Sequence, residues 1–360
     1  MKKYLSAFVL GAFLIFTQSY ALDEPQQPAD YHAFIERARD AVVLIAAQGE
    51  TSGFGSGFVV SADGIVVTNY HVIHRAEKIM AWFYDEEDPK YYVADVIGID
   101  PAADLAVLRL NVKDEMLPLV HLQIEDEKEK IRVGDNVIAI GHLLGLDWTV
   151  TTGGVSHVNR PGNVMPYVKM VQHTAPINRG NSGGPLINYD GHVIGMNTAV
   201  RMMNNQTVGV AYALRGDIMY VSVIKIISGQ EVIRAGLGVK LRQLSEFSYK
   251  KLSEMAPDTI IPNTFGAFVV EMTEDSWAYN QGLRNFDSIV AIDGIPINGA
   301  SDAVDMLSKK QVGDVVTLIV IRDGVFTLVE YELKPMEFDY MAHFDKRMKA
   351  AQEKQQQPSE

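Results

Sequence analysis

A long succession of short β-type runs constrains the fold of this chain more than any other feature. Each run is rich in Val, Ile and other apolar residues, and Gly, Asp or Asn stand at many of the turns between runs. The runs are Val42–Ala46, Gly57–Val60, Ile65–Thr68, Lys78–Phe83, Tyr91–Ile99, Ala106–Leu110, Asn136–Ile140, Val155–Val158, Tyr167–Gln172, Pro185–Ile187, Val193–Thr198 and Val208–Ala213. Strands of this length at this spacing predict an all-β barrel or sandwich.

A helix and then a different pattern come after these strands. Arg215–Ser228 is apolar at helical spacing and is expected to close the first domain. Roughly a hundred residues of mixed α/β pattern come next, which is enough for a small separate domain. We therefore divide the chain into a first domain at residues 31–228, a second domain at 235–334 and a polar tail at 335–360.

The N-terminus has the pattern of an export signal. Lys2 and Lys3 precede the apolar run Leu5–Phe16, which is shorter than the roughly 20 residues of a membrane-spanning helix. We predict a signal peptide over residues 1–21, cleaved after its last residue, and a flexible leader over residues 22–30. The alternative is an uncleaved membrane anchor.

Composition narrows the class of protein further. The 360 residues are 47% hydrophobic, which is typical of a globular chain with a sizeable core. The formal net charge of -13 argues against a nucleic-acid partner, because phosphate backbones require a basic surface. The chain contains no cysteine, which excludes a lipoprotein anchor and disulfides. Export without disulfides suits the periplasm of a Gram-negative bacterium.

The stretch Gly-Asn-Ser-Gly-Gly-Pro-Leu at Gly180–Leu186 carries the strongest chemical signal. A serine flanked by glycines can sit on a tight turn with its hydroxyl exposed. The same turn can direct the backbone N–H groups of Gly180 and Ser182 into one concavity. A nucleophile beside such an oxyanion hole is the equipment for acyl transfer.

A serine nucleophile also requires a general base and a group that orients the base. His71 follows an apolar strand and turn, whereas the alternative, His74, lies at a polar boundary. Asp104 stands immediately before a buried strand, where a charge is costly unless it is paired. Asp100 is the competing acid, although its place before a proline favours a turn role. The order His71, Asp104, Ser182 is that of the chymotrypsin-type double-barrel proteases.

These motifs together resemble the HtrA (Deg) family of trypsin-fold serine proteases. The resemblance covers about Tyr31 to Leu333, and the second domain resembles a PDZ domain. The matching segments are Thr68–Ile73, Asp100–Leu108, Ile177–Leu186, Asp190–Thr198, Gly236–Val239 and Ala278–Asn298. The resemblance implies a mainly β fold, with a chymotrypsin-like double six-stranded β-barrel followed by a small α/β PDZ domain.

The resemblance also implies a function, namely serine endopeptidase activity on unfolded or mislocalised proteins through an acyl-enzyme. His71, Asp104 and Ser182 would form the triad, without a metal or organic cofactor. C-terminal peptides would bind to a carboxylate loop at the second domain and regulate activity, and the chain would form a trimer or a multiple of trimers. The loop residues are Gly236, Leu237, Gly238 and Val239. The alternatives are a peptide-binding chaperone or scaffold with an inactive protease fold, and a signalling protease with one dedicated substrate.

The chain departs from the family pattern just before the serine. Thr174 stands where the family has an aspartate, and Arg179 stands where it has a proline. Pro176, six residues before the serine, occupies the place where trypsin-like enzymes carry the acid that selects Lys or Arg. We therefore expect cleavage after an apolar residue. Tyr31 and Phe34 are expected either to make trimer contacts or to pack on their own barrel.

Overall fold

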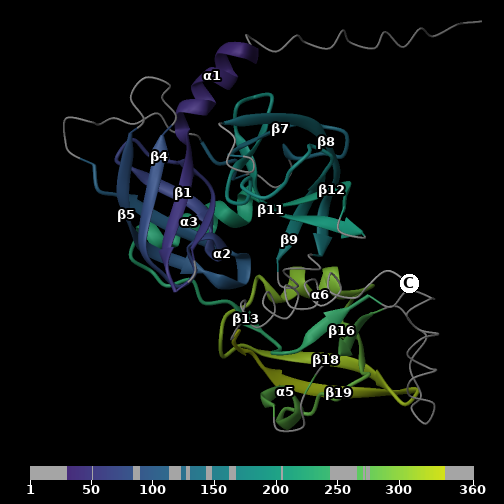
Figure 1. The fold of residues 1–360 in the computed structure, drawn as a ribbon. Helices are drawn as coiled ribbons and strands as arrows, with labels where there is room; N and C mark the ends of the chain where they lie inside the picture. Colours follow the sequence, from purple (N-terminus) through teal and green to yellow (C-terminus); the bar gives the residue numbers. More distant parts are fainter. Residues whose placement is uncertain are drawn as a thin grey trace, which may run out of the picture.

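The structure is a computed structural model that places two β-barrels beside a smaller sheet domain (Figure 1). It describes residues 31–50, 52–83, 90–112, 123–126, 130–142, 148–161, 168–203, 206–243, 266–270, 272 and 276–336. The expected signal peptide, the leader and residues 337–360 of the expected tail lie outside the described residues.

The first barrel is antiparallel and closed, with strand order β1-β2-β3-β6-β5-β4. Its strands are β1 (Val42–Gly49), β2 (Gly53–Val59), β3 (Ile65–Asn69), β4 (Ala76–Phe83), β5 (Tyr91–Asp100) and β6 (Leu105–Leu110). Two short helices interrupt it, α2 (Tyr70–Ile73) after β3 and the 3-10 helix η1 (Pro101–Ala103) before β6. All five residues of β3 are buried, so this strand is a rigid support for the helix at its end.

The second barrel has the same size, with strand order β10-β11-β12-β9-β8-β7. Its strands are β7 (Asn136–Gly141), β8 (Thr149–Pro161), β9 (Lys169–His173), β10 (Pro185–Asn188), β11 (Val193–Met203) and β12 (Gln206–Arg215). Helix α3 (Gly216–Ile227) closes the domain, as the apolar spacing predicts. The expected double six-stranded barrel is confirmed.

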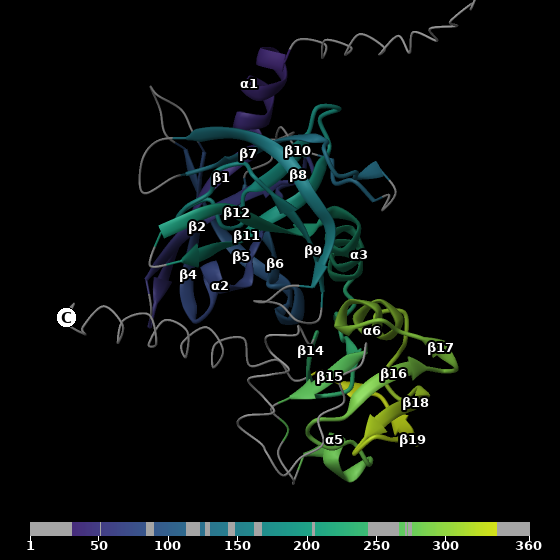
Figure 2. The same cartoon turned by 90° about the vertical axis from the view of Figure 1, so that its right-hand side faces the viewer.

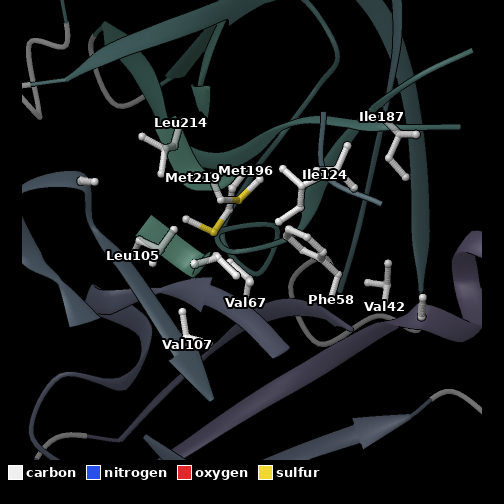
Figure 3. Packing of buried hydrophobic residues seen from close by; sticks show 14 of the residues in the cluster. Val42, Phe58, Val67, Leu105, Val107, Ile124, Ile187, Met196, Leu214 and Met219 are labelled. Atoms are coloured by element: carbon white, nitrogen blue, oxygen red, sulfur yellow. The ribbon is translucent and has the colours of Figure 1, made fainter. Parts of the chain in front are cut away.

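One hydrophobic cluster joins the two barrels. Phe58 on β2 and Val67 on β3 pack with Met196 on β11, Leu214 on β12 and Met219 on α3, all fully buried (Figure 3). Burying apolar side chains of this size is worth about 1.5–3 kcal/mol each. The shared cluster therefore holds the barrels in one orientation and brings strand ends from both into contact.

Helix α1 (Tyr31–Ala41) precedes β1 and lies against the second barrel. The ring of Phe34 contacts Gly191, where an added Cβ would lie only 3.0 Å from it. The Arg39 guanidinium stands over the Trp148 ring, 5.8 Å from its centroid. Phe34 thus packs on its own chain, and the side chain of Tyr31 lies outside the described residues.

The second domain is a sheet of order β14-β15-β16-β18-β19, to which β17 adds at β16. Its elements are β14 (Lys240–Arg242), β15 (Ala267–Val270), α5 (Trp277–Asn280), β16 (Ser288–Ile292), β17 (Ile295–Pro296), α6 (Ala300–Leu307), β18 (Val315–Arg322) and β19 (Val325–Glu332). A separate pair, β13 (Ala235–Gly236) with β20 (Lys334–Pro335), closes the domain at its entrance. Pairing therefore extends to Pro335, one residue into the segment expected to be tail.

Two ion pairs join the domains. Arg234, just before β13, donates to the carboxylate of Asp100 at the end of β5, with an Nη2–Oδ2 distance of 2.6 Å. Lys169 lies on β9 and its side chain is almost fully buried. It pairs with Asp305 on α6. Helix α6 accordingly lies between the PDZ-like sheet and the second barrel (Figure 2).

Some expected elements differ in extent. The expected strand Val155–Val158 is part of β8, which runs from Thr149 to Pro161 because Gly153 and Gly154, which lack apolar character, still pair along β7. Strand β14 was not predicted, because it has only three residues and no alternation to detect.

Candidate active site

The structure brings His71 and Asp104 together at the end of β3. The Nδ1 of His71 lies 2.6 Å from Oδ2 of Asp104, and the other oxygen of that carboxylate accepts the backbone N–H of His71 at 2.8 Å. The carboxylate side chain is fully buried, whereas the imidazole is 15% exposed. A hydrogen bond at Nδ1 leaves Nε2 as the ring atom that can exchange protons with a neighbouring hydroxyl.

The backbone of Asp104 is itself held in an unusual conformation. Asp104 caps η1 in the left-handed region, with φ 50° and ψ 46°. Its carbonyl accepts hydrogen bonds from the Tyr70 N–H at 3.1 Å and from Nδ2 of Asn69 at 2.9 Å. Nδ2 of Asn69 also bonds Oγ1 of Thr198 on β11 at 3.1 Å. These bonds connect the acid, the end of β3 and the second barrel.

Ser182 lies on a turn that is fastened to the first barrel. The backbone N–H of Ser56 on β2 donates to the Ser182 carbonyl at 2.8 Å. The next residue, Gly183, has φ 85° and packs so closely that an added Cβ would lie 2.1 Å from the Ser56 carbonyl and 2.5 Å from Oγ1 of Thr68. Only glycine satisfies both conditions. Ser182 is thereby placed beside the end of β3, the strand that leads into the helix of His71.

The four residues before Ser182 form a type II turn. Asn181 N–H donates to the Asn178 carbonyl at 3.1 Å, and Gly180 in the third position has φ 107°. A type I turn would require a negative φ at that position and would reverse the central peptide, between Arg179 and Gly180. The Gly180 carbonyl is held by Oγ of Ser56 at 2.6 Å.

The backbone donors of this turn are available to a ligand. Within the described residues, neither the Gly180 N–H nor the Ser182 N–H donates a hydrogen bond to another protein group. Gly180 is nevertheless buried, and buried backbone N–H groups are nearly always paired. Two unpaired donors two residues apart, beside a serine, are what an oxyanion hole requires.

Sequence reasoning missed two polar residues that hold this turn. Ser56 contacts it through both its Oγ and its backbone N–H. Asn197 on β11 accepts the Gly183 N–H at 2.8 Å and donates Nδ2 to the carbonyls of Gly184 and Pro185 at 3.2 and 3.0 Å. Neither residue has a signal in its local sequence, because its partners are more than ten positions away.

The segment that departs from the family pattern includes Thr174 and Pro176 and is hydrogen-bonded to strand β8. Thr174 and Gly154 exchange hydrogen bonds, since the Thr174 N–H donates to the Gly154 carbonyl at 3.0 Å and Oγ1 accepts the Gly154 N–H at 3.0 Å. Gly153 must be glycine, because an added Cβ would lie 2.1 Å from the backbone nitrogen of Ala175. Pro176 receives the Thr151 hydroxyl on its carbonyl at 2.7 Å.

His173, at the end of β9, is fully buried. Burial lowers its pKa to about 4, and neighbouring Asn197 opposes that shift slightly. No hydrogen bond of normal geometry joins the two side chains, and within the described residues both ring nitrogens lack a partner. The imidazole of His173 is therefore neutral at pH 7. It lies beside Asn197, the residue on β11 that holds the Ser182 turn.

The two competing candidates have other partners. His74 shares its Nδ1 with the Tyr70 hydroxyl at 2.9 Å. Asp100 accepts Oγ of Ser222 on α3 at 2.8 Å, in addition to the guanidinium of Arg234. Asp100 also caps η1 through the Ala103 N–H at 3.3 Å. It therefore connects α3, the second domain and the short helix that ends at the buried aspartate beside His71.

The candidate carboxylate loop lies at the entrance of the second domain. Gly238 has φ 63° and open space where a Cβ would stand, whereas a Cβ on Gly236 would lie 2.5 Å from the side chain of Met336. Leu237 and Val239 are buried in the core of this domain. Gly236 is therefore required for packing, and Gly238 is the position where a ligand can approach the backbone.

Comparison with known proteins agrees with this geometry. A trypsin-like peptidase domain model matches residues 55–196, and a PDZ domain model matches residues 235–333. A "Probable periplasmic serine endoprotease DegP-like" from Chlamydia muridarum is 36% identical over 273 residues, which are 76% of this chain and 52% of that protein. The chain belongs to the HtrA family. The serine protease HTRA1 of Xenopus tropicalis is 34% identical over 293 residues, 79% of this chain and 60% of the relative.

A solved HtrA-type protease is similar to this structure over most of its length. The structure of "HtrA-type protease AlgW with tripeptide" superposes with a TM-score of 0.66 and 28% identity, over 85% of this chain and 97% of that chain. This chain spans about half the length of the curated relatives it matches. No helix within the described residues is long and apolar enough to cross a membrane.

Proposed function

We propose that this chain is a serine endopeptidase. The observation that carries the proposal is the His71–Asp104 pair together with a serine turn in which the N–H groups of Gly180 and Ser182 donate to no other described residue. In this mechanism Ser182 attacks the scissile carbonyl while His71 takes its proton. The tetrahedral oxyanion accepts hydrogen bonds from the N–H groups of Gly180 and Ser182. His71 then protonates the leaving amine, and water releases the acyl group by the same steps in reverse order.

Asp104 has two roles in this scheme. Its Oδ2 holds the imidazole in the tautomer that presents Nε2, and its charge stabilises the imidazolium that forms. Its burial makes both effects stronger than they would be in water. A binding protein would have no need for this arrangement, so we prefer the enzyme to the scaffold alternative.

The wider function follows the family. We propose substrates that are unfolded or mislocalised proteins, a periplasmic location after removal of residues 1–21, and a trimer or a multiple of trimers. Relatives named as periplasmic endoproteases support the location. C-terminal peptides would bind at Gly236–Val239 and regulate the protease, and the similar AlgW structure with its tripeptide supports peptide binding in a protease of this kind.

The contact between Arg234 and Asp100 supplies a route for such regulation. Arg234 lies two residues before Gly236, and Asp100 lies four residues before Asp104. A shift of the peptide-binding loop would therefore act on the acid of the triad through one ion pair and one short helix.

Hydrolysis of unfolded casein tests the central proposal. Wild type is expected to cleave casein, and Ser182→Ala is expected to reduce kcat by at least about 10⁴-fold without loss of fold. Ser61→Ala, on an exposed turn of the first barrel, is the matched control and should retain activity. Activity that survives Ser182→Ala would refute Ser182 as the nucleophile.

A further inference from the structure

A pocket of about 470 Å³ lies where the two domains meet. The second domain contributes the loop at Gly236–Val239 and apolar residues of β14 and α6, among them Leu241 and Leu307. The protease domain contributes one wall through α3, with Val221 and Lys225. A ligand that fills this pocket is thus in contact with both domains at once.

The pocket has an apolar floor and a cationic rim. Lys225, Arg234 and Lys310 line it, and no Asp or Glu is among its described lining residues. This absence of acids contrasts with the net charge of -13 on the whole chain. An occupant that is apolar and carries one negative charge would complement the pocket, which describes the free C-terminal end of a peptide with an apolar last residue.

Two of the three cations are already paired. Arg234 binds Asp100 at 2.6 Å, and Nζ of Lys310 lies 2.6 Å from Oδ2 of Asp293. Lys225 forms no ion pair with any described residue. It is therefore the cation in this pocket that is available to a carboxylate.

The position of Lys225 on α3 places it near the loop. Lys225 is three residues after Ser222, so the two side chains share one face of the helix. Ser222 Oγ lies 3.3 Å from Nη2 of Arg234. The backbone carbonyl of Arg234 accepts the N–H of Met336, and the Met336 side chain packs against Gly236. Lys225 lines the same pocket as Gly236, Leu237 and Val239 of the loop.

We propose that Lys225, a residue of the protease domain, binds the terminal carboxylate of the peptide that occupies the second domain. This inference rests on the proposed peptide binding at Gly236–Val239 and adds a residue from outside that domain. Peptide occupancy then bridges α3 and the carboxylate loop. The alternative for Lys225 is a solvated lysine that only compensates the C-terminal end of α3.

Peptide affinity measured on the full chain tests the proposal. Fluorescence anisotropy would follow a labelled ten-residue peptide ending in valine, prepared as the free acid and as the C-terminal amide, with Ser182→Ala as the background that prevents cleavage. Lys225→Gln is expected to weaken binding of the free acid about tenfold and to leave binding of the amide unchanged. Lys309→Gln, an exposed lysine outside the pocket, is the matched control and should change neither affinity.

The outcomes separate this inference from the function on which it rests. Equal affinity of Lys225→Gln and its parent for the free acid would overturn the role of Lys225 while peptide binding stands. Equal weakening of acid and amide would overturn it too, because it would indicate a packing role. Failure of the parent chain to bind either peptide would overturn both peptide binding and this inference, while casein hydrolysis by the wild type still tests the protease proposal separately.

Discussion

Acid should destabilise this protein through His173. The ring is fully buried at the end of β9, and burial lowers its pKa from 6.5 to about 4. Because the unfolded chain binds this proton more readily, the neutral ring's contribution to stability is fully present above pH 6.5. It is lost as the pH falls from 6.5 towards 4. At about 1.4 kcal/mol per pH unit, the loss reaches about 3 kcal/mol at pH 4.

A difference measurement isolates this contribution. His173→Leu keeps similar volume and removes the titration, and it costs little elsewhere because neither ring nitrogen has a described partner. The free energy of unfolding in urea would be measured for both proteins from pH 4 to pH 7.5. Carboxylates titrate in both proteins and cancel, so wild type should lose about 3 kcal/mol more than the variant.

The same experiment can refute the reasoning. Parallel stability curves for wild type and His173→Leu between pH 4 and 6.5 would show that burial does not depress the pKa of this ring. An NMR titration of the imidazole in the folded protein with a midpoint near 6.5 would lead to the same conclusion.

Three further results are expected. Gly180→Ala should lower kcat at least about 100-fold, because φ 107° is strained for alanine and the turn would reverse its central peptide. Gly134→Ala is the control, since Gly134 also has a positive φ, 95°, but has open space around it, and this variant should keep its activity. In a double-mutant cycle on unfolding, Asp100→Asn and Arg234→Gln should couple by about 2 kcal/mol, and additive losses would exclude the ion pair as a link. Cleavage-site profiling should return apolar residues before the cut, since Pro176 supplies no charge, and mainly Lys or Arg would contradict this.

The sequence predicted what depends on local pattern. Strand runs and turn residues predicted an all-β barrel or sandwich, and the resemblance to the HtrA family specified two six-stranded barrels. The motif around Ser182 indicated a tight turn because its glycines permit few other conformations. It did not reveal Ser56 or Asn197, which hold that turn from β2 and β11. A serine or asparagine that bonds a backbone far along the chain looks the same in sequence as one that faces water.

The contrast between Asp100 and Asp104 shows where sequence reasoning reaches its limit. Both acids are buried, so the rule that a buried charge must be paired applies equally to each. The rule does not say which partner each acid takes. Asp104 pairs with His71 because the strands next to these two residues, β6 and β3, are neighbours in the first barrel. Asp100 pairs with Arg234, which lies 134 residues further along the chain. Because the two acids are joined by η1, their separate pairings form one connection from the pocket between the domains to the imidazole of His71, and only the tertiary structure makes it visible.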